Sequence, residues 1–151
     1  MAKSSARPRN LVINWAPCNA LQPGELPMFS HVTVGTNDLP RARTFYDSVL
    51  DALGYENLGN KETASLWGGA GPRFVVLTPS DGNAASVGNG LTVGFAAADR
   101  ASVDEFHKRA LQRGGTDAGA PGFRDVGPNV YAAYIRDPDG HKLVASCISE
   151  S

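Results

Sequence analysis

The chain has 151 residues, of which 42% are hydrophobic and 19% are charged, and its formal net charge is −1. This composition suits one compact soluble domain and excludes a chain that is disordered throughout. The charges of both signs are interspersed, without the basic stripe that follows a phosphate backbone, so nucleic acid is not an expected partner. No apolar run approaches the roughly 20 residues that a membrane-spanning helix needs, so a membrane is not expected as a partner either.

The first 27 residues differ in character from the rest, because they are basic, rich in proline and without helical or strand periodicity. We therefore expect a leader or extension at 1–27 and one domain at 28–151. The apolar run LVINWA is too short for a secretory signal. The sequence leaves open whether Met28 is the native start. Two cysteines, Cys18 and Cys147, form neither a disulfide framework nor a zinc ligand set, which favours a cytoplasmic location.

The stretch from Phe29 to Leu53 returns in a degraded second copy 61 residues later. Each copy has the pattern of a strand, a capped turn and a helix that ends at glycine. Two copies are too few for a solenoid, so the modules, at about 28–80 and 90–149, must close on each other. The matching pairs are His31 with Thr92, Asp38 with Asp99, Phe45 with Phe106 and Gly54 with Gly115.

In the first module, residues 29–34 alternate as a strand does, with His31 and Thr33 on one face and Val32 and Val34 on the other. The apolar face should meet a helix that starts after Asn37 or Asp38 and ends at Gly54. Three short strands are expected next, at 55–58, 63–67 and 73–77.

The turn-forming segment 78–90 is expected to connect the modules. The second copy predicts a strand at 91–97 and a helix at about 101–113, capped by Asp99 or Ser102. Its inner stripe should comprise Val103, Phe106, His107, Ala110 and Leu111. An irregular, mobile segment is expected at 115–129, and strands at 130–136 and 141–148 should flank a tight turn, DPDG, at 137–140, with His141 in a structural role.

The expected fold class is α+β, with two tandem βαβββ modules that form a curved mixed sheet around a cup and carry their helices on the convex side. A concave hollow of this kind is the default binding site.

Three stretches, HVTV, NDLPRARTFY and YAAYIRDPDGHKLVASC, resemble the vicinal oxygen chelate superfamily over about residues 28–148. This superfamily includes glyoxalases, bleomycin-resistance proteins and extradiol dioxygenases. The resemblance implies the fold described above. It also implies a homodimer, since ligands in the bleomycin-resistance branch commonly lie in a groove between subunits.

Enzymes of this superfamily hold a divalent metal with a His near the start of a module's first strand and a carboxylate on its last strand. His31 matches this pattern. Thr92, Val75 and Val144 occupy the other three positions, and a neutral hydroxyl or a valine is a poor donor for a divalent ion. The departure implies that the chain has no metal site and no cofactor, with a divalent metal as the alternative.

Several side chains are candidates for ligand binding on the cup face. His31 could orient a ligand or act as an acid or base, or it could be a hydrogen-bonded inward histidine without chemistry. Arg73 and Lys142 are repeat counterparts that suit a carboxylate or phosphate, or else have their heads in solvent. Trp67, Tyr131 and Tyr134 could form flat walls of the cup, and core packing would explain each of them equally well. The full set is His31, Thr33, Trp67, Arg73, Thr92, Tyr131 and Lys142.

The predicted function is the binding of a small organic ligand in the cup, without a metal or with a metal-free activity centred on His31. The alternative is a metal-dependent lyase, isomerase or dioxygenase of the lactoylglutathione lyase type. A third possibility, a structural or regulatory module, predicts a cup filled by the protein's own side chains.

Overall fold

The computed structural model describes residue 24 and residues 27–148. The expected leader at 1–27 otherwise lies outside the described residues. The first module contains β1 (His31–Gly35), α1 (Leu39–Asp51), β2 (Glu56–Asn60), β3 (Ala64–Gly68) and β4 (Arg73–Leu77). The second contains β5 (Thr92–Ala96), α2 (Arg100–Gln112), β6 (Thr116–Arg124), β7 (Val130–Arg136) and β8 (Lys142–Ile148). The predicted α+β class with two βαβββ modules is confirmed.

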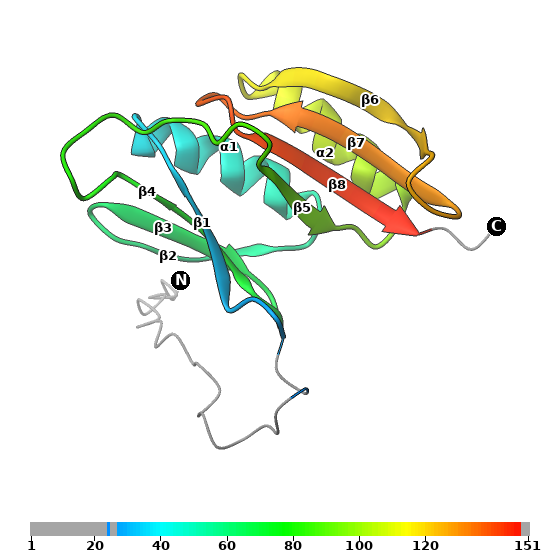
Figure 1. Ribbon diagram of the computed structural model, residues 1–151, viewed down its shortest axis with the longest axis horizontal. Coiled ribbons are helices and arrows are strands. Elements are labelled where there is room, and N and C mark those ends of the chain that lie inside the picture. The colour runs from blue at the N-terminus through cyan, green and yellow to red at the C-terminus, as the bar shows by residue number, and fades with distance from the viewer. Residues whose placement is uncertain (1–23, 25–26, 149–151) are drawn as a thin grey trace, which may run out of the picture.

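The strands form two four-stranded sheets, in the orders β1-β4-β3-β2 and β5-β8-β7-β6 (Figure 1). In each sheet the module's first strand pairs in parallel with its last strand, and the other pairs are antiparallel. Each sheet is therefore mixed, as expected. β1 and β5 each lie at an edge of their sheet. Among the described residues, no strand of one module pairs with a strand of the other.

The two helices begin in the same way, 61 residues apart. The carboxylate of Asp38 accepts a hydrogen bond from the backbone N–H of Arg41, and that of Asp99 accepts one from Ser102. Both are N-caps, because the side chain satisfies an N–H that has no partner within the helix. The structure selects these two aspartates from the alternatives that the sequence left open.

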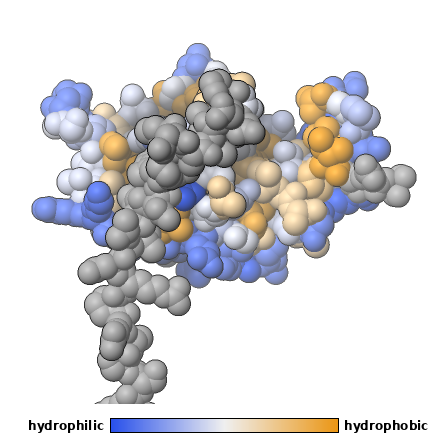
Figure 2. All heavy atoms as spheres, turned by 90° about the horizontal axis from the view of Figure 1, so that it is seen from below, coloured by the Kyte–Doolittle hydropathy of each residue, from blue (hydrophilic) through white to orange (hydrophobic). Residues whose placement is uncertain are grey.

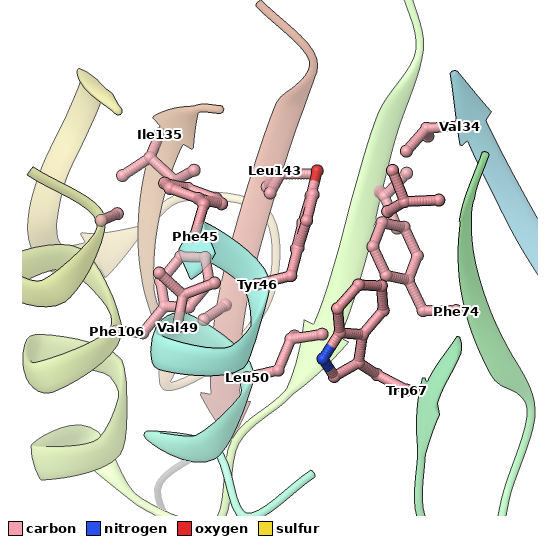
Figure 3. Packing of buried hydrophobic residues seen from close by; sticks show 14 of the residues in the cluster. Val34, Phe45, Tyr46, Val49, Leu50, Trp67, Phe74, Phe106, Ile135 and Leu143 are labelled. Carbon is pink, nitrogen blue, oxygen red and sulfur yellow. The ribbon is translucent and has the colours of Figure 1, made fainter. Parts of the chain in front are cut away.

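α1 packs against both modules, which joins them in one hydrophobic core (Figure 3). Phe45 points toward Ile135 of β7 and Phe106 of α2, whereas Leu50 points toward Trp67 of β3. All five side chains are at most 1% exposed. The helix-facing sides of the two sheets therefore share one interior, and the opposite sides, which we call the helix-free faces, do not contribute to it.

The turn at 137–140 also joins the modules, because it lies against the end of β1 and the start of α1. The Thr36 hydroxyl donates a hydrogen bond of 2.5 Å to the carboxylate of Asp139, and the Arg41 guanidinium donates one of 3.1 Å. Next to the turn, His141 is buried, and its Nε2 lies 2.7 Å from the carbonyl oxygen of Gly35. His141, which directly precedes β8, thus connects the second module with the end of β1, in agreement with a structural role.

Two expectations for the second module were wrong. The segment expected to be irregular contains β6, which pairs with β7 through two register shifts. Gly119 and Gly122 lie at these shifts and interrupt the alternation that would have indicated a strand. Leu111, expected on the inner stripe of α2, is 43% exposed.

Some apolar side chains remain on the surface at the end of the second sheet. Phe123, Val126 and Ile148 are 57%, 73% and 75% exposed. Figure 2 shows hydrophobic atoms gathered on this side of the molecule, where Figure 1 draws the turn between β6 and β7. Within the described residues, neither helix combines the length and the apolar character that a bilayer crossing requires.

Candidate functional site

A cavity of about 310 Å³ lies between the modules. One wall comes from the first module, including Leu50 of α1 and the stretch from Trp67 to Phe74, and the other comes from residues 93–96 of β5. The side chains that define the walls are Val32, Leu50, Trp67, Phe74, Val93 and Phe95. The cavity therefore opens at the edge of the shared apolar interior, and His31 does not line it, although its neighbour in register, Arg73, does.

Aromatic rings form much of the wall. Trp67 and Phe74 have ring centroids 6.3 Å apart, and Phe74 meets Phe95 of the other module edge to face at 5.2 Å. The indole N–H of Trp67 donates a hydrogen bond of 2.8 Å to Asp47 on α1. The indole plane is thus held in one orientation, and its polar atom is satisfied away from the cavity.

The turn between β3 and β4, GGAGP at 68–72, forms part of the rim. Arg73 lies beside this turn, and its Nη1 donates hydrogen bonds to the carbonyl oxygens of Gly69 and Gly71, at 2.7 and 2.6 Å. A Cβ atom on Gly68 would lie only 2.9 Å from Cδ of Arg73. The glycine thus leaves room for the arginine side chain.

Tyr55 bridges the two modules at the cavity. It follows α1 in the first module, and its hydroxyl donates a hydrogen bond of 2.9 Å to the carbonyl oxygen of Ala96 in β5. Both residues line the cavity. The bond fixes the separation of the two walls at this point.

His31 and Thr33 lie on the helix-free face of the first sheet, as the strand alternation predicted. Both are exposed, whereas Val34 is buried on the opposite face. Nδ1 of His31 lies 2.9 Å from the hydroxyl oxygen of Ser30. Neither His31 nor Thr33 lines the cavity, although His31 lies in register beside Arg73 of β4, which does. The role expected for His31 stays a prediction.

The corresponding face of the second sheet carries Thr92, Lys142 and Val144. Thr92 pairs in register with Lys142, and Val144 lies two residues further along β8. The ammonium group of Lys142 lies over the ring of Tyr134, 5.1 Å from its centroid. Thr92, Lys142, Val144 and Tyr134 do not line the cavity. Lys142 therefore differs from its repeat counterpart Arg73, which does.

Tyr131 lies on the opposite, helix-facing side of β7. Its hydroxyl donates a hydrogen bond of 2.8 Å to Asp104 on α2, and this bond raises the pKa of Tyr131 above its usual value. The Arg100 guanidinium lies 5.8 Å from the ring centroid. The structure does not bring Tyr131 to His31 or to the cavity. Tyr131 instead connects β7 with α2, which is a structural role.

The side chains at the family's four ligand positions do not fit a divalent metal. His31 and Val75 lie on the helix-free face of the first sheet, and Thr92 and Val144 on that of the second. Only the imidazole is a good donor, since a valine has no lone pair to offer. Across the described residues, no three His, Cys, Asp or Glu side chains form a group that could hold a metal ion.

Sequence reasoning identified two residues of the cavity, Trp67 and Arg73, and missed the others. Val32 was expected on the face that meets a helix, because apolar alternation indicates a buried face without showing where that face stays open. The glycine-rich turn was an available signal, since a backbone without side chains permits a close approach.

Comparison with known proteins identifies the superfamily that the sequence motifs resemble. The model of the Glyoxalase/Bleomycin resistance protein/Dioxygenase superfamily matches residues 28–144. No curated protein matches the chain.

Two solved structures illustrate the likeness. A glyoxalase/bleomycin resistance protein from Albidiferax ferrireducens T118 is 42% identical, with a TM-score of 0.74, over 80% of this chain and 98% of that one. A glyoxalase-related enzyme from Fulvimarina pelagi is 18% identical, with a TM-score of 0.64, over 80% and 88% of the two chains, and shows the likeness of fold alone. The described chain, with its two βαβββ modules, therefore belongs to the glyoxalase/bleomycin resistance protein/dioxygenase superfamily.

Proposed function

We propose that this protein binds a small, largely apolar organic molecule in the cavity between its modules, without a metal ion. The observation that carries the proposal is the cavity of about 310 Å³ with walls of Trp67, Phe74 and Phe95. Its volume is near the lower end of the range of small-molecule sites, about 300–1,000 Å³. Flat aromatic walls favour a flat ligand, because rings stack or meet edge to face.

The proposal is preferred to two alternatives. A metal-dependent lyase, isomerase or dioxygenase would need donors that Val75, Thr92 and Val144 do not supply. A module with only a structural role would have its interior filled by its own side chains, and the cavity between the modules argues against that.

Neighbouring residues of β1 provide a matched test, because Val32 lines the cavity and Thr33 lies on the helix-free face. Neutral aromatic probes, naphthamide and phenylacetamide, should bind the wild type in roughly the millimolar range, given their size. The substitution Val32→Phe should fill the cavity and weaken binding by at least about tenfold, since a ring replaces the space that the probe occupies. Thr33→Phe should leave binding unchanged, as followed by NMR titration.

The proposal fails if neither probe binds, or if Thr33→Phe blocks binding and Val32→Phe does not. The second result would place the ligand on the face that carries His31. Circular dichroism and thermal unfolding of both variants establish that each one is folded.

Metal analysis of protein purified without chelators tests the absence of a metal. We expect far less than one equivalent of Zn²⁺, Ni²⁺, Mn²⁺ or Fe²⁺, because one imidazole binds such an ion weakly. Stoichiometric metal that is lost in His31→Ala would instead support the metal-dependent alternative.

The proposal also includes a homodimer, which family membership supports, and a cytoplasmic location, which the absence of a disulfide framework in the sequence favours. Light scattering during size-exclusion chromatography should give twice the chain's 15.9 kDa. The mass of a single chain would contradict the dimer.

A further inference from the structure

Among the described residues that line the cavity, Arg73 is the only one with a charged side chain. The other lining residues are apolar, aromatic or glycine. No carboxylate of the described residues lies within ion-pairing distance of the Arg73 guanidinium. The half-buried cation thus stands beside an apolar space without a compensating anion.

The orientation of this guanidinium is fixed by the chain around it. Nη1 is bound to the carbonyl oxygens of Gly69 and Gly71, and Gly68 accommodates the aliphatic part of the side chain. A planar guanidinium bound along one edge can present its remaining donors in a defined direction, which suits a carboxylate.

The aromatic walls of the cavity offer a surface for the apolar part of a ligand, beside the cationic Arg73. Trp67, Phe74 and Phe95 form a continuous series of ring contacts across the cavity, with Trp67 held by Asp47. A flat ring placed against this wall would have its polar substituent at the rim, since the wall offers little else to a charged group.

We infer that the ligand is a small aromatic carboxylate, with its ring among Trp67, Phe74 and Phe95 and its carboxylate on Arg73. This inference rests on the proposed function and adds the chemical class of the ligand. A hydrogen bond between two charged groups contributes more to the free energy of binding than one to a neutral amide. The carboxylate should therefore bind roughly tenfold more tightly than the matching amide, even though Arg73 is partly exposed to solvent.

The test compares matched pairs, naphthoate with naphthamide and phenylacetate with phenylacetamide, by NMR titration at low ionic strength. We expect the wild type to prefer each carboxylate roughly tenfold. Arg73→Gln should abolish the preference and retain most of the affinity for the amide. If Arg73 only stabilises the rim turn, the substitution will weaken both members of a pair equally, and the inference is overturned.

Arg124→Gln is the matched control. Arg124 also binds main-chain carbonyl oxygens, those of Ala120 and Ala132, but it lies in the second module outside the cavity. This variant should keep the wild-type preference for carboxylates. A loss of preference in Arg124→Gln would contradict the assignment to Arg73.

Salt dependence tests the inference without any substitution, in case Arg73→Gln does not fold. The preference for the carboxylate should shrink as ionic strength rises from about 0.02 to 0.5 M, while amide binding stays constant. If both members of a pair bind equally in the wild type and Val32→Phe blocks both, the proposed function stands and this inference fails. If neither binds, the proposed function itself fails.

Discussion

Tyr46 and Asp137 form a buried pair that connects α1 with the turn before β8. The Tyr46 hydroxyl donates a hydrogen bond of 2.6 Å to the carboxylate of Asp137, and Tyr46 is fully buried. Burial, followed by the charge of Asp137, raises the pKa of Tyr46 well above its usual value of 10.0. Burial also raises the pKa of Asp137, although its hydrogen bond from Tyr46 and the nearby His141 act in the opposite direction.

The substitution Tyr46→Phe should therefore have an effect that depends on pH. At about pH 7.5 the lost hydrogen bond should lower the free energy of unfolding by about 1–3 kcal/mol. The pKa of Tyr46 is higher in the folded than in the unfolded chain, so the unfolded chain loses this proton first as pH rises. The stabilisation from Tyr46 is then complete below about pH 10 and decreases above it, and the deficit of Tyr46→Phe should narrow there.

Urea unfolding at about pH 7.5, 9.5 and 11 measures this difference. Tyr134→Phe controls for the general effect of alkali, because Tyr134 lies on the helix-free face of the second sheet, paired with Val144. A deficit of Tyr46→Phe that stays constant over the whole range would contradict the prediction.

At the level of elements, the two helices end differently although they begin alike. Gly54 follows α1 with φ of +80°, but its repeat counterpart, Gly115, does not have a positive φ, and the preceding Gly114 takes that conformation with φ of +90°. A Cβ atom on Gly115 would lie 2.8 Å from the carbonyl oxygen of Arg136 and 3.0 Å from the ring of Phe45. One glycine is needed for its backbone angle and the other for space.

Paired substitutions should separate these two causes. Gly54→Ala should cost about 1 kcal/mol of unfolding free energy, and Gly54→Asn less, because asparagine tolerates the left-handed conformation. Gly115→Ala should cost about 1–3 kcal/mol from overpacking, and Gly115→Asn more, because its side chain is larger. Thermal and urea unfolding measure the order within each pair. Asparagine better than alanine at both positions, or at neither, would contradict it.

At the level of the whole molecule, the turn at 137–140 keeps the modules together at one end. Asp139 accepts hydrogen bonds from the Thr36 hydroxyl, the Asn37 backbone N–H and the Arg41 guanidinium. All three donors belong to the first module. The carboxylate therefore links the end of β1 and the first turn of α1 to the second module.

Asp139→Ala should lower the free energy of unfolding by about 2–4 kcal/mol, because hydrogen bonds to a charged acceptor contribute more than neutral ones. Amide hydrogen exchange should become faster both in the first turn of α1 and at 137–141, since the two segments hold each other in place. Asp125→Ala, in the exposed turn after β6, is the control and should change neither quantity by much. Faster exchange confined to 137–141 would show that the turn does not couple the modules.

The repeat, the helix caps and the turn at 137–140 could be read from the sequence because each depends on residues close together in the chain. Asp38 and Asp99 needed only an N–H three residues away, and the alternation in β1 placed His31 opposite Val32. β6 could not be read in this way, because its glycines break the alternation and its pairing with β7 supplies the missing information.

The sequence by itself therefore determined the repeated strand and helix of each module and, in the strands that alternate, the face on which a side chain lies, since both follow from local periodicity. Only the tertiary structure decided which faces meet. It turned the helix-facing sides of both modules toward α1 and left the cavity beside Trp67 and Arg73, whereas His31, the neighbour of Arg73 in the sheet, does not line it. The physical reason is that strand alternation fixes which residues share a face, whereas the partner of that face comes from packing between residues far apart in the chain.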